Sequence, residues 1–544
     1  MTVTADAPAA APASESTAPR PAPPGLAGIL GSGDHKVVGR LWLVASMAHL
    51  ALVGVISVLL SAERIDPATL SIFGSDTVVQ ADGFRFIAGI FLFVVPLTLA
   101  VATSVVPLQV GASTLAFPRA AAAAAWTYLV GGGLLLGAYA IDGGPGGTDR
   151  DGVVLFVVAF VLVLVALAVT WICVATTVLA LRTPGMGLAR VPLFSWSALV
   201  AASVWILTLP VLAGLSVISY LDARYGGFLD GSEAGLYNRI AWSFGTPAIY
   251  VLAVPVVGFV GSVVPVFAQT RHHLHRVALG LIGLLGALSV GAWTAPNLAG
   301  SLPWLYDGPW IVVSVVALVP ILGLVGLWAA TLRKGKVVLA SPLLFGLVAL
   351  LLALLGLAAG AAQAIKPIKT VVDGSGTTLY GTAWSTGVTA LLLLAGAAAG
   401  LGGIVYWAPK IVGSRLHEGG ARLVAGLVLI GAAVGCLATL AAGLLGEPGP
   451  TVLGPTDNLD AIKTLDVVVT AGDAVLVLAG VLFILLLCRA AMSGDDPSDD
   501  PWSGHTLEWA TTSPPPVGNF TSVPEVTSEA PLYDARHRAQ EGDA

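Results

Sequence analysis

Long apolar stretches recur along almost the whole chain, and this recurrence limits the possible folds more than any other feature. A helix of about 20 residues crosses the roughly 30 Å hydrocarbon layer of a bilayer. Of the 544 residues, 56% are hydrophobic and only 10% are charged, a composition outside the range of soluble domains. Twelve membrane spans are predicted, at approximately residues 38–61, 84–108, 121–141, 152–181, 191–219, 241–268, 275–299, 308–331, 340–365, 382–408, 420–445 and 466–490.

The segments between these spans are short, and none is long enough for a soluble domain. We therefore predict an all-α integral membrane protein with one twelve-helix bundle over residues 34–491. The 65 glycines suit close helix packing in lipid, where small residues let helices approach.

Both ends of the chain differ in composition from the spans. Residues 1–33 are rich in Ala, Pro, Ser and Thr, which predicts a disordered N-terminal tail. Residues 492–544 are polar and rich in proline, which predicts an extended C-terminal tail without a core of its own, and the last 20 or so residues are expected to be disordered.

The loops alternate in charge, and this pattern predicts the orientation of the bundle. One set carries most of the basic residues, among them Arg119, Arg182, Arg190, Arg271, Arg333, Lys334, Lys410 and Arg422, whereas the opposite set carries mainly acids. Both termini are therefore expected on the cytoplasmic side of a bacterial-type plasma (inner) membrane. The net charge of −6 argues against nucleic-acid binding.

One predicted span contains the sequence LYNRIAWSFGTPAIY, residues 236–250. It resembles the central motif of the heme-copper oxidase subunit I family, in which a Trp precedes Phe-Gly-His-Pro-Glu-Val-Tyr. Trp242, Phe244, Gly245, Pro247 and Tyr250 match this motif.

Other segments resemble the same family in the same order along the chain. They are Asp34-His35-Lys36 before the first span, Arg182-Thr183-Pro184-Gly185-Met186 after the fourth, Gly402-Gly403 with Trp407 in the tenth, and His505-Thr506-Leu507-Glu508-Trp509 in the C-terminal tail. This resemblance implies the fold of cytochrome c oxidase subunit I, a place in the respiratory chain, and partners similar to oxidase subunits II and III.

The positions at which the family carries its redox and proton-transfer residues hold other residues here. Thr246 stands at the copper-binding His and Ala248 at the proton-handling Glu, and Ala295 and Pro296 stand at the His-His pair. The low-spin heme ligand of the second span falls at Phe84 or Arg85, and the two heme-ligating histidines of the tenth span fall at Gly387 and Thr389. The two proton-channel positions fall at Thr114 and Leu324, and Leu445 to Pro450 lack the arginine pair that binds heme propionates.

A threonine hydroxyl does not replace an imidazole on copper, which favours nitrogen and sulfur donors. We therefore predict no heme or copper. His272, His273 and His275 are weak candidates for a metal site, and a solvated basic loop is the preferred interpretation. Asp473 and Arg85 are expected near the outer interface, where a charged side chain reaches water.

Three hypotheses follow. The preferred one is a non-catalytic structural or assembly subunit of a respiratory complex. The second is a terminal oxidase subunit, which transfers electrons to oxygen through heme and copper held by unconventional ligands. The third is a transporter that uses the vacated heme cavities.

Overall fold

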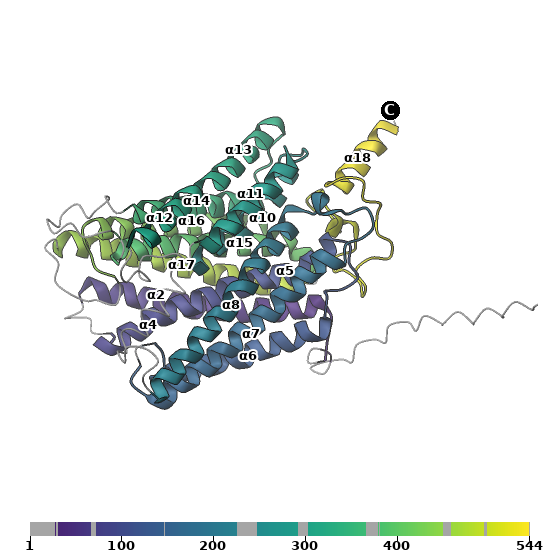
Figure 1. The fold of residues 1–544 in the computed structure, drawn as a ribbon. Helices are drawn as coiled ribbons and strands as arrows, with labels where there is room; N and C mark the ends of the chain where they lie inside the picture. The colour runs from purple at the N-terminus through teal and green to yellow at the C-terminus, as the bar shows by residue number, and fades with distance from the viewer. Residues whose placement is uncertain are drawn as a thin grey trace, which may run out of the picture.

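The structure is a computed structural model, and it describes residues 28, 31–66, 72–145, 147–225, 247–291, 303–365, 379, 381–449, 459–493 and 498–542. These residues form a bundle of helices that run roughly side by side (Figure 1). In chain order the long helices are α2 (His35–Ile65), α4 (Ser75–Ile87), η1 (Ala88–Val94), α5 (Val95–Gln109), α6 (Pro118–Ala140), α7 (Arg150–Ala180), α8 (Leu193–Tyr225), α10 (Pro247–Phe267), α11 (His275–Gly291), α12 (Pro303–Val316), α13 (Leu318–Lys334), α14 (Ser341–Ala364), α15 (Ala383–Ile411), α16 (Glu418–Leu444), α17 (Leu459–Ser493) and α18 (Pro531–Gly542).

The predicted membrane bundle is confirmed. Eleven of the described helices are long and apolar enough to cross a bilayer. The remaining predicted span, 275–299, corresponds to α11, which is apolar but shorter and reaches Gly291 at the edge of the described residues. The helices α4, η1 and α5 form one span from Thr77 to Gln109, in which η1 is a π-helical turn.

Some helix boundaries differ from the predicted ones, for physical reasons. The predicted span 308–331 is interrupted, because α12 ends at Val316 and α13 begins at Leu318. Pro320 explains the break, since it has no N–H to donate to residue 316 and its ring clashes with that carbonyl group. The last span begins at Leu459 rather than near residue 466, which places Asp473 well inside the helix.

The C-terminal residues 498–542 pack on one end of the bundle, which we call the tail face. This end also carries the start of α2 and the end of α15, and it lies at the right in Figure 1. His35 Nε2 and Asn519 Oδ1 are 2.9 Å apart, and Asn519 Nδ2 donates to the Ala112 carbonyl oxygen at 2.8 Å. The opposite end of the bundle is called the far face.

A carboxyl group of the tail reaches into the bundle. Glu508 is fully buried, and its Oε1 accepts hydrogen bonds from Gln109 Nε2 at 3.0 Å and Trp407 Nε1 at 3.1 Å. Burial raises the pKa of Glu508, and these donors oppose the shift. The tail therefore has the extended course that its composition predicts, but it shares the core of the bundle.

The end of the chain is helical rather than disordered. Helix α18 spans Pro531–Gly542, and Tyr533 at its start packs against the His505 ring, with the ring centroids 4.8 Å apart. Arg536 Nη1 donates to Asp500 Oδ2 at 3.0 Å. The prediction of disorder failed here because partners distant in the sequence stabilise this short polar helix. Residues 1–27 of the predicted N-terminal tail lie outside the described residues.

Docking of the tail is expected to weaken in acid. Burial, and next the charge of Arg536, lower the pKa of His505 from 6.5 to about 3. The undocked histidine takes up a proton below pH 6.5, while the docked one does not. The contribution of neutral His505 to the free energy of tail docking is therefore complete above pH 6.5. It is lost as the pH falls towards 3, by up to about 1.4 kcal/mol per pH unit. Hydrogen exchange of residues 498–542, corrected for intrinsic rates, should show less protection at pH 5 than at pH 7.5. His505→Phe should remove most of this difference, and an unchanged difference would contradict the assignment.

Candidate functional site

Two of the expected heme-ligand positions line a common cavity. Arg85 on α4 and Thr389 on α15 both border a void of about 200 Å³ between α2, η1, α15 and α17. Phe84 instead turns towards α6, where its ring packs against Tyr139 with the ring centroids 5.0 Å apart. Gly387 faces Leu440 of α16, because the Cβ that it lacks would lie 2.8 Å from Leu440 Cδ2. The structure thus brings together only part of the predicted set.

The wall of the cavity is mainly apolar. Besides Arg85 and Thr389, its polar side chains are Ser57, Thr386 and Asp473. Thr389 Oγ1 donates to the Ser385 carbonyl oxygen of its own helix at 3.0 Å. The apolar lining consists of Leu50, Ala51, Val53, Gly54, Val55, Phe86, Phe93, Ala390, Leu393, Leu394, Leu476, Val477, Gly480 and Val481.

A cluster of charged side chains lies beside this cavity, towards the far face. Glu63, Arg64, Arg85, Glu447 and Asp466 surround a second void of about 40 Å³. Arg64 Nε donates to Glu447 Oε1 at 2.9 Å, and the same nitrogen lies 4.0 Å from Asp466 Oδ1. No predicted site contained this cluster, although one signal for it was present, the acid Glu447 where the family carries its arginine pair.

Arg85 has its own carboxylate partner. Its Nη2 lies 2.6 Å from Asp82 Oδ1, one turn earlier on α4, and its guanidinium lies over the Phe86 ring, 5.3 Å from the centroid. The Arg85 side chain is 21% exposed, so it reaches water as expected only in part. Its charge is compensated inside the bundle.

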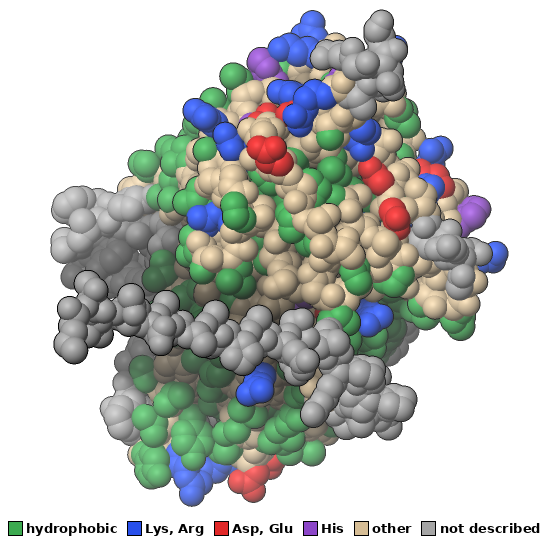
Figure 2. All heavy atoms as spheres, turned by 90° about the vertical axis from the view of Figure 1, so that its right-hand side faces the viewer, with side chains coloured by type: hydrophobic (Ala, Val, Ile, Leu, Met, Phe, Trp, Pro, Cys, Tyr) green, Lys and Arg blue, Asp and Glu red, His purple; other side chains and the backbone are tan. Residues whose placement is uncertain are grey.

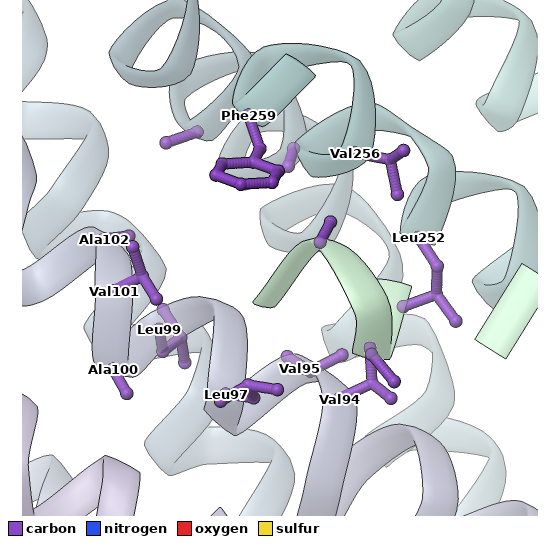
Figure 3. Close-up of a cluster of buried hydrophobic side chains, with 14 of the residues drawn as sticks. Val94, Val95, Leu97, Leu99, Ala100, Val101, Ala102, Leu252, Val256 and Phe259 are labelled. Carbon is purple, nitrogen blue, oxygen red and sulfur yellow. The ribbon is translucent and has the colours of Figure 1, made fainter. Parts of the chain in front are cut away.

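The centre of the bundle, next to the cavity, is filled by close helix packing (Figure 3). Val94 of η1, Leu97 of α5 and Leu252 of α10 are buried there around α15. The Cβ that Gly396 lacks would lie 2.7 Å from Val94 Cγ1, and that of Gly400 would lie 2.5 Å from Leu97 Cδ2. Glycine at these positions of α15 lets the neighbouring side chains occupy the space against the helix.

This packing predicts opposite effects for two glycine substitutions. Gly400→Ala should lower the free energy of unfolding by about 1–3 kcal/mol, because the added methyl group overlaps Leu97 in a packed core. Gly426→Ala on α16 is the control, since nothing lies within 4 Å of its missing Cβ, and it should be neutral or stabilising by up to about 1 kcal/mol. Thermal unfolding in nanodiscs measures both. Equal effects of the two substitutions on the free energy of unfolding would contradict the close approach of Leu97 to Gly400.

The donors around the cavity do not fit heme iron. Axial ligands of heme are His, Cys, Met or Tyr, and none of the residues that line the cavity is of these types. His49 on α2 lies nearby in sequence, but its Nδ1 contacts the Ala45 carbonyl oxygen at 2.7 Å and its ring faces Tyr128 of α6. The cavity therefore has polar groups but no heme ligand.

Only some of the residues at the predicted copper-binding and proton-transfer positions belong to the described part of the chain. Thr246, Ala295 and Pro296 lie outside the described residues, and Ala248 is described only as backbone at the start of α10. Tyr250 is buried, and its hydroxyl group lies against Gly360 of α14. Leu324 is fully buried on α13, and Thr114 is half-buried in the loop after α5.

The three clustered histidines have separate partners. His272 Nε2 accepts from Trp328 Nε1 at 3.1 Å, His273 Nδ1 contacts Lys334 Nζ at 3.1 Å, and His275 Nε2 contacts the Val191 carbonyl oxygen at 3.2 Å. Burial lowers the pKa of His272 to about 4. The loop is thus partly buried rather than solvated, and within the described residues no group of His, Cys, Asp and Glu is arranged to hold a metal ion.

The comparisons with known proteins agree with the fold. The family profile described as "Cytochrome C and Quinol oxidase polypeptide I" matches residues 37–475. The chain belongs to this family, that of heme-copper oxidase subunit I.

Similar proteins have related names. A cytochrome c oxidase subunit 1 of Corynebacterium efficiens is 28% identical, and the match covers 93% of this chain and 88% of that protein. A heme-copper oxidase subunit I+III of Aeropyrum pernix is also 28% identical over 91% of this chain and 62% of its own length. A heme-copper terminal oxidase solved as a dimer by cryo-EM shares the fold, with a TM-score of 0.66, 14% identity and 84% of each chain covered.

Proposed function

We propose that this chain is a non-catalytic subunit of a respiratory membrane complex, with a structural or assembly role. The observation that carries the proposal is the donor set of the cavity, in which Arg85 and Thr389 stand at expected heme-ligand positions and no lining residue is an axial ligand of heme. Fold alone does not confer a function whose site residues are absent.

The docked tail supports a scaffold role. Lys410 is fully buried at the end of α15, and its Nζ donates to the carbonyl oxygens of Asp499, Thr511 and Thr512 at 3.0, 2.5 and 3.3 Å. These contacts shape the tail face without any redox group. Such a surface is suited to bind other subunits, and we propose partners similar to oxidase subunits II and III.

The charge of the tail face supports the proposed orientation. Lys and Arg side chains are spread over this end of the molecule (Figure 2), among them the exposed Arg40, Arg190 and Arg271. Basic loops remain on the cytoplasmic side of bacterial membranes. We therefore propose that both termini are cytoplasmic and that the bundle lies in the plasma membrane.

The test is to purify the full chain from its own membranes in mild detergent. We expect less than about 0.1 heme and 0.1 copper per chain, because heme groups need axial donors, while oxidase subunits should co-purify with the chain. After a high-salt and detergent wash removes the partners, an absorption spectrum, heme extraction and copper analysis are made on the isolated chain. Stoichiometric heme or copper would overturn the proposal and support an oxidase with unconventional ligands. A chain that purifies alone would refute the subunit role.

A further inference from the structure

We infer that the cavity between α2, η1, α15 and α17 binds a lipophilic cation, which is a molecule with a mainly apolar surface and one positive charge. The inference concerns this cavity only, and it does not depend on whether the chain is a subunit of a complex. It rests on the opening of the cavity, on its apolar wall and on the charge balance of its polar groups.

The cavity opens towards the lipid-facing surface of the bundle. Ala51 and Val55 of α2 and Val481 of α17 line it and are exposed, whereas Leu393, Leu394 and Phe93 line its inner part. An apolar ligand can therefore enter from the bilayer without crossing water. Gly54 and Gly480 also line the cavity, and the Cβ that Gly54 lacks would lie 3.0 Å from Val477 Cγ2, so α2 and α17 approach closely there. The apolar wall favours such a ligand by about 25 cal/mol per Å² of buried apolar surface.

Asp473 supplies the charge that selects the ligand. It lies 14 residues after the start of α17, about 21 Å along the helix, and inside the span Asp460–Ser493. Acids at this depth are costly and usually face a functional cavity. Asp473 forms no ion pair within the part of the chain that the structure describes, and its electrostatic neighbours are Arg85 and the Ser61 hydroxyl.

The remaining charges favour a cation over an anion. The ion pair with Asp82 compensates Arg85, and the one with Glu447 compensates Arg64. Asp466, Glu63 and Asp473 then leave an excess of carboxyl groups over arginines around the two neighbouring voids, which share Arg85 and Thr386 in their walls. An anionic amphiphile such as a fatty-acid carboxylate would be repelled by this excess.

Aromatic rings complete the site. Phe86 and Phe93 both line the cavity, and aromatic faces bind quaternary ammonium groups and similar cations, most strongly where water is excluded. Phe86 already lies under the Arg85 guanidinium. The site therefore combines a carboxylate, aromatic rings and an apolar wall, which together match a lipophilic cation.

The experiment measures equilibrium binding of tritiated tetraphenylphosphonium to the full chain in nanodiscs of zwitterionic phosphatidylcholine. We expect saturable binding of one cation per chain, and Asp473→Asn should weaken it about tenfold or more, which is at least about 1.4 kcal/mol. Asp460→Asn is the matched control, because Asp460 is exposed at the start of the same helix, and it should bind as the unmodified chain does. Dodecyltrimethylammonium should compete, whereas dodecanoate, with the same chain length and opposite charge, should not.

Further variants keep the test decisive if Asp473→Asn does not fold. Asp473→Glu retains the charge and should retain binding, and Ala390→Phe fills the cavity and should abolish binding. Size-exclusion chromatography and thermal unfolding of each variant establish its folded state. The inference is overturned if binding does not saturate, if Ala390→Phe binds normally, or if dodecanoate competes as well as the cation, in which case the cavity holds lipid chains.

Discussion

Lys410→Met should release the C-terminal tail from the bundle. The lysine side chain is fully buried and its ammonium group donates to three tail carbonyl oxygens, while it also lies 5.3 Å from the centroid of the Trp509 ring. Methionine fills a similar volume but has no donor, and each buried carbonyl left without a partner costs about 1–3 kcal/mol. We expect docking of the tail to weaken by about 3 kcal/mol or more. In nanodiscs, chymotrypsin should then cleave after Trp509, which is buried in the native chain.

The control for this prediction is Lys336→Met, because Lys336 is exposed after the end of α13. It should leave cleavage after Trp509 as slow as in the unmodified chain. Since the three acceptors of Lys410 Nζ belong to the tail, the thermal unfolding of the membrane helices should change less than the cleavage rate. Resistance of the Lys410→Met tail to cleavage would show that Glu508 and the aromatic contacts are enough to hold it.

The tail shows what could be read from the sequence and what could not. Its motif, His505-Thr506-Leu507-Glu508-Trp509, indicated the family correctly. Its composition predicted an extended chain without a core of its own, because a proline-rich segment without apolar periodicity cannot bury its own surface. The partners that bury it, such as Gln109 and Trp407, are 399 and 101 residues from Glu508, and no local pattern encodes such distances.

The loop from Arg182 to Met186 also packs against a part of the chain that is distant in the sequence. In the structure the Cβ that Gly185 lacks would lie 2.6 Å from the Val526 carbonyl oxygen, and Arg190 Nη1 donates to the same oxygen at 3.3 Å. The loop packs against the tail of its own chain, so contacts within the chain are enough to explain its sequence.

The spans themselves were predictable because lipid permits few alternatives. A segment of apolar residues long enough to cross the bilayer must satisfy its backbone hydrogen bonds internally, and a helix does so. The cavity was not predictable, because it depends on how close four helices approach. Thr389 borders open space, whereas Gly387, Gly396 and Gly400 are each packed closely against side chains of neighbouring helices.

Arg64→Met should be among the most destabilising substitutions on the far face. The Arg64 side chain is 15% exposed, and those of Glu447 and Asp466 are each 6% exposed. Arg64 also donates through Nη2 to the Pro448 carbonyl oxygen at 3.2 Å, so it joins the end of α2 to the loop between α16 and α17. Without the arginine two carboxylates remain buried without a cation, and breaking a buried pair in this way costs about 3–5 kcal/mol. The midpoint of thermal unfolding in nanodiscs measures the loss.

Two further variants separate lost charge compensation from lost packing. Arg64→Met combined with Glu447→Gln should recover part of the stability, because the carboxylate nearest to the missing guanidinium is then neutral. Arg422→Met is the surface control, since its pair with Glu418 is half-exposed and such pairs contribute about 0–1 kcal/mol. If Arg64→Met were as stable as Arg422→Met, the cluster would be open to water. Asp466 would then be hydrated, and the excess negative charge beside the cavity would no longer favour a cation within it.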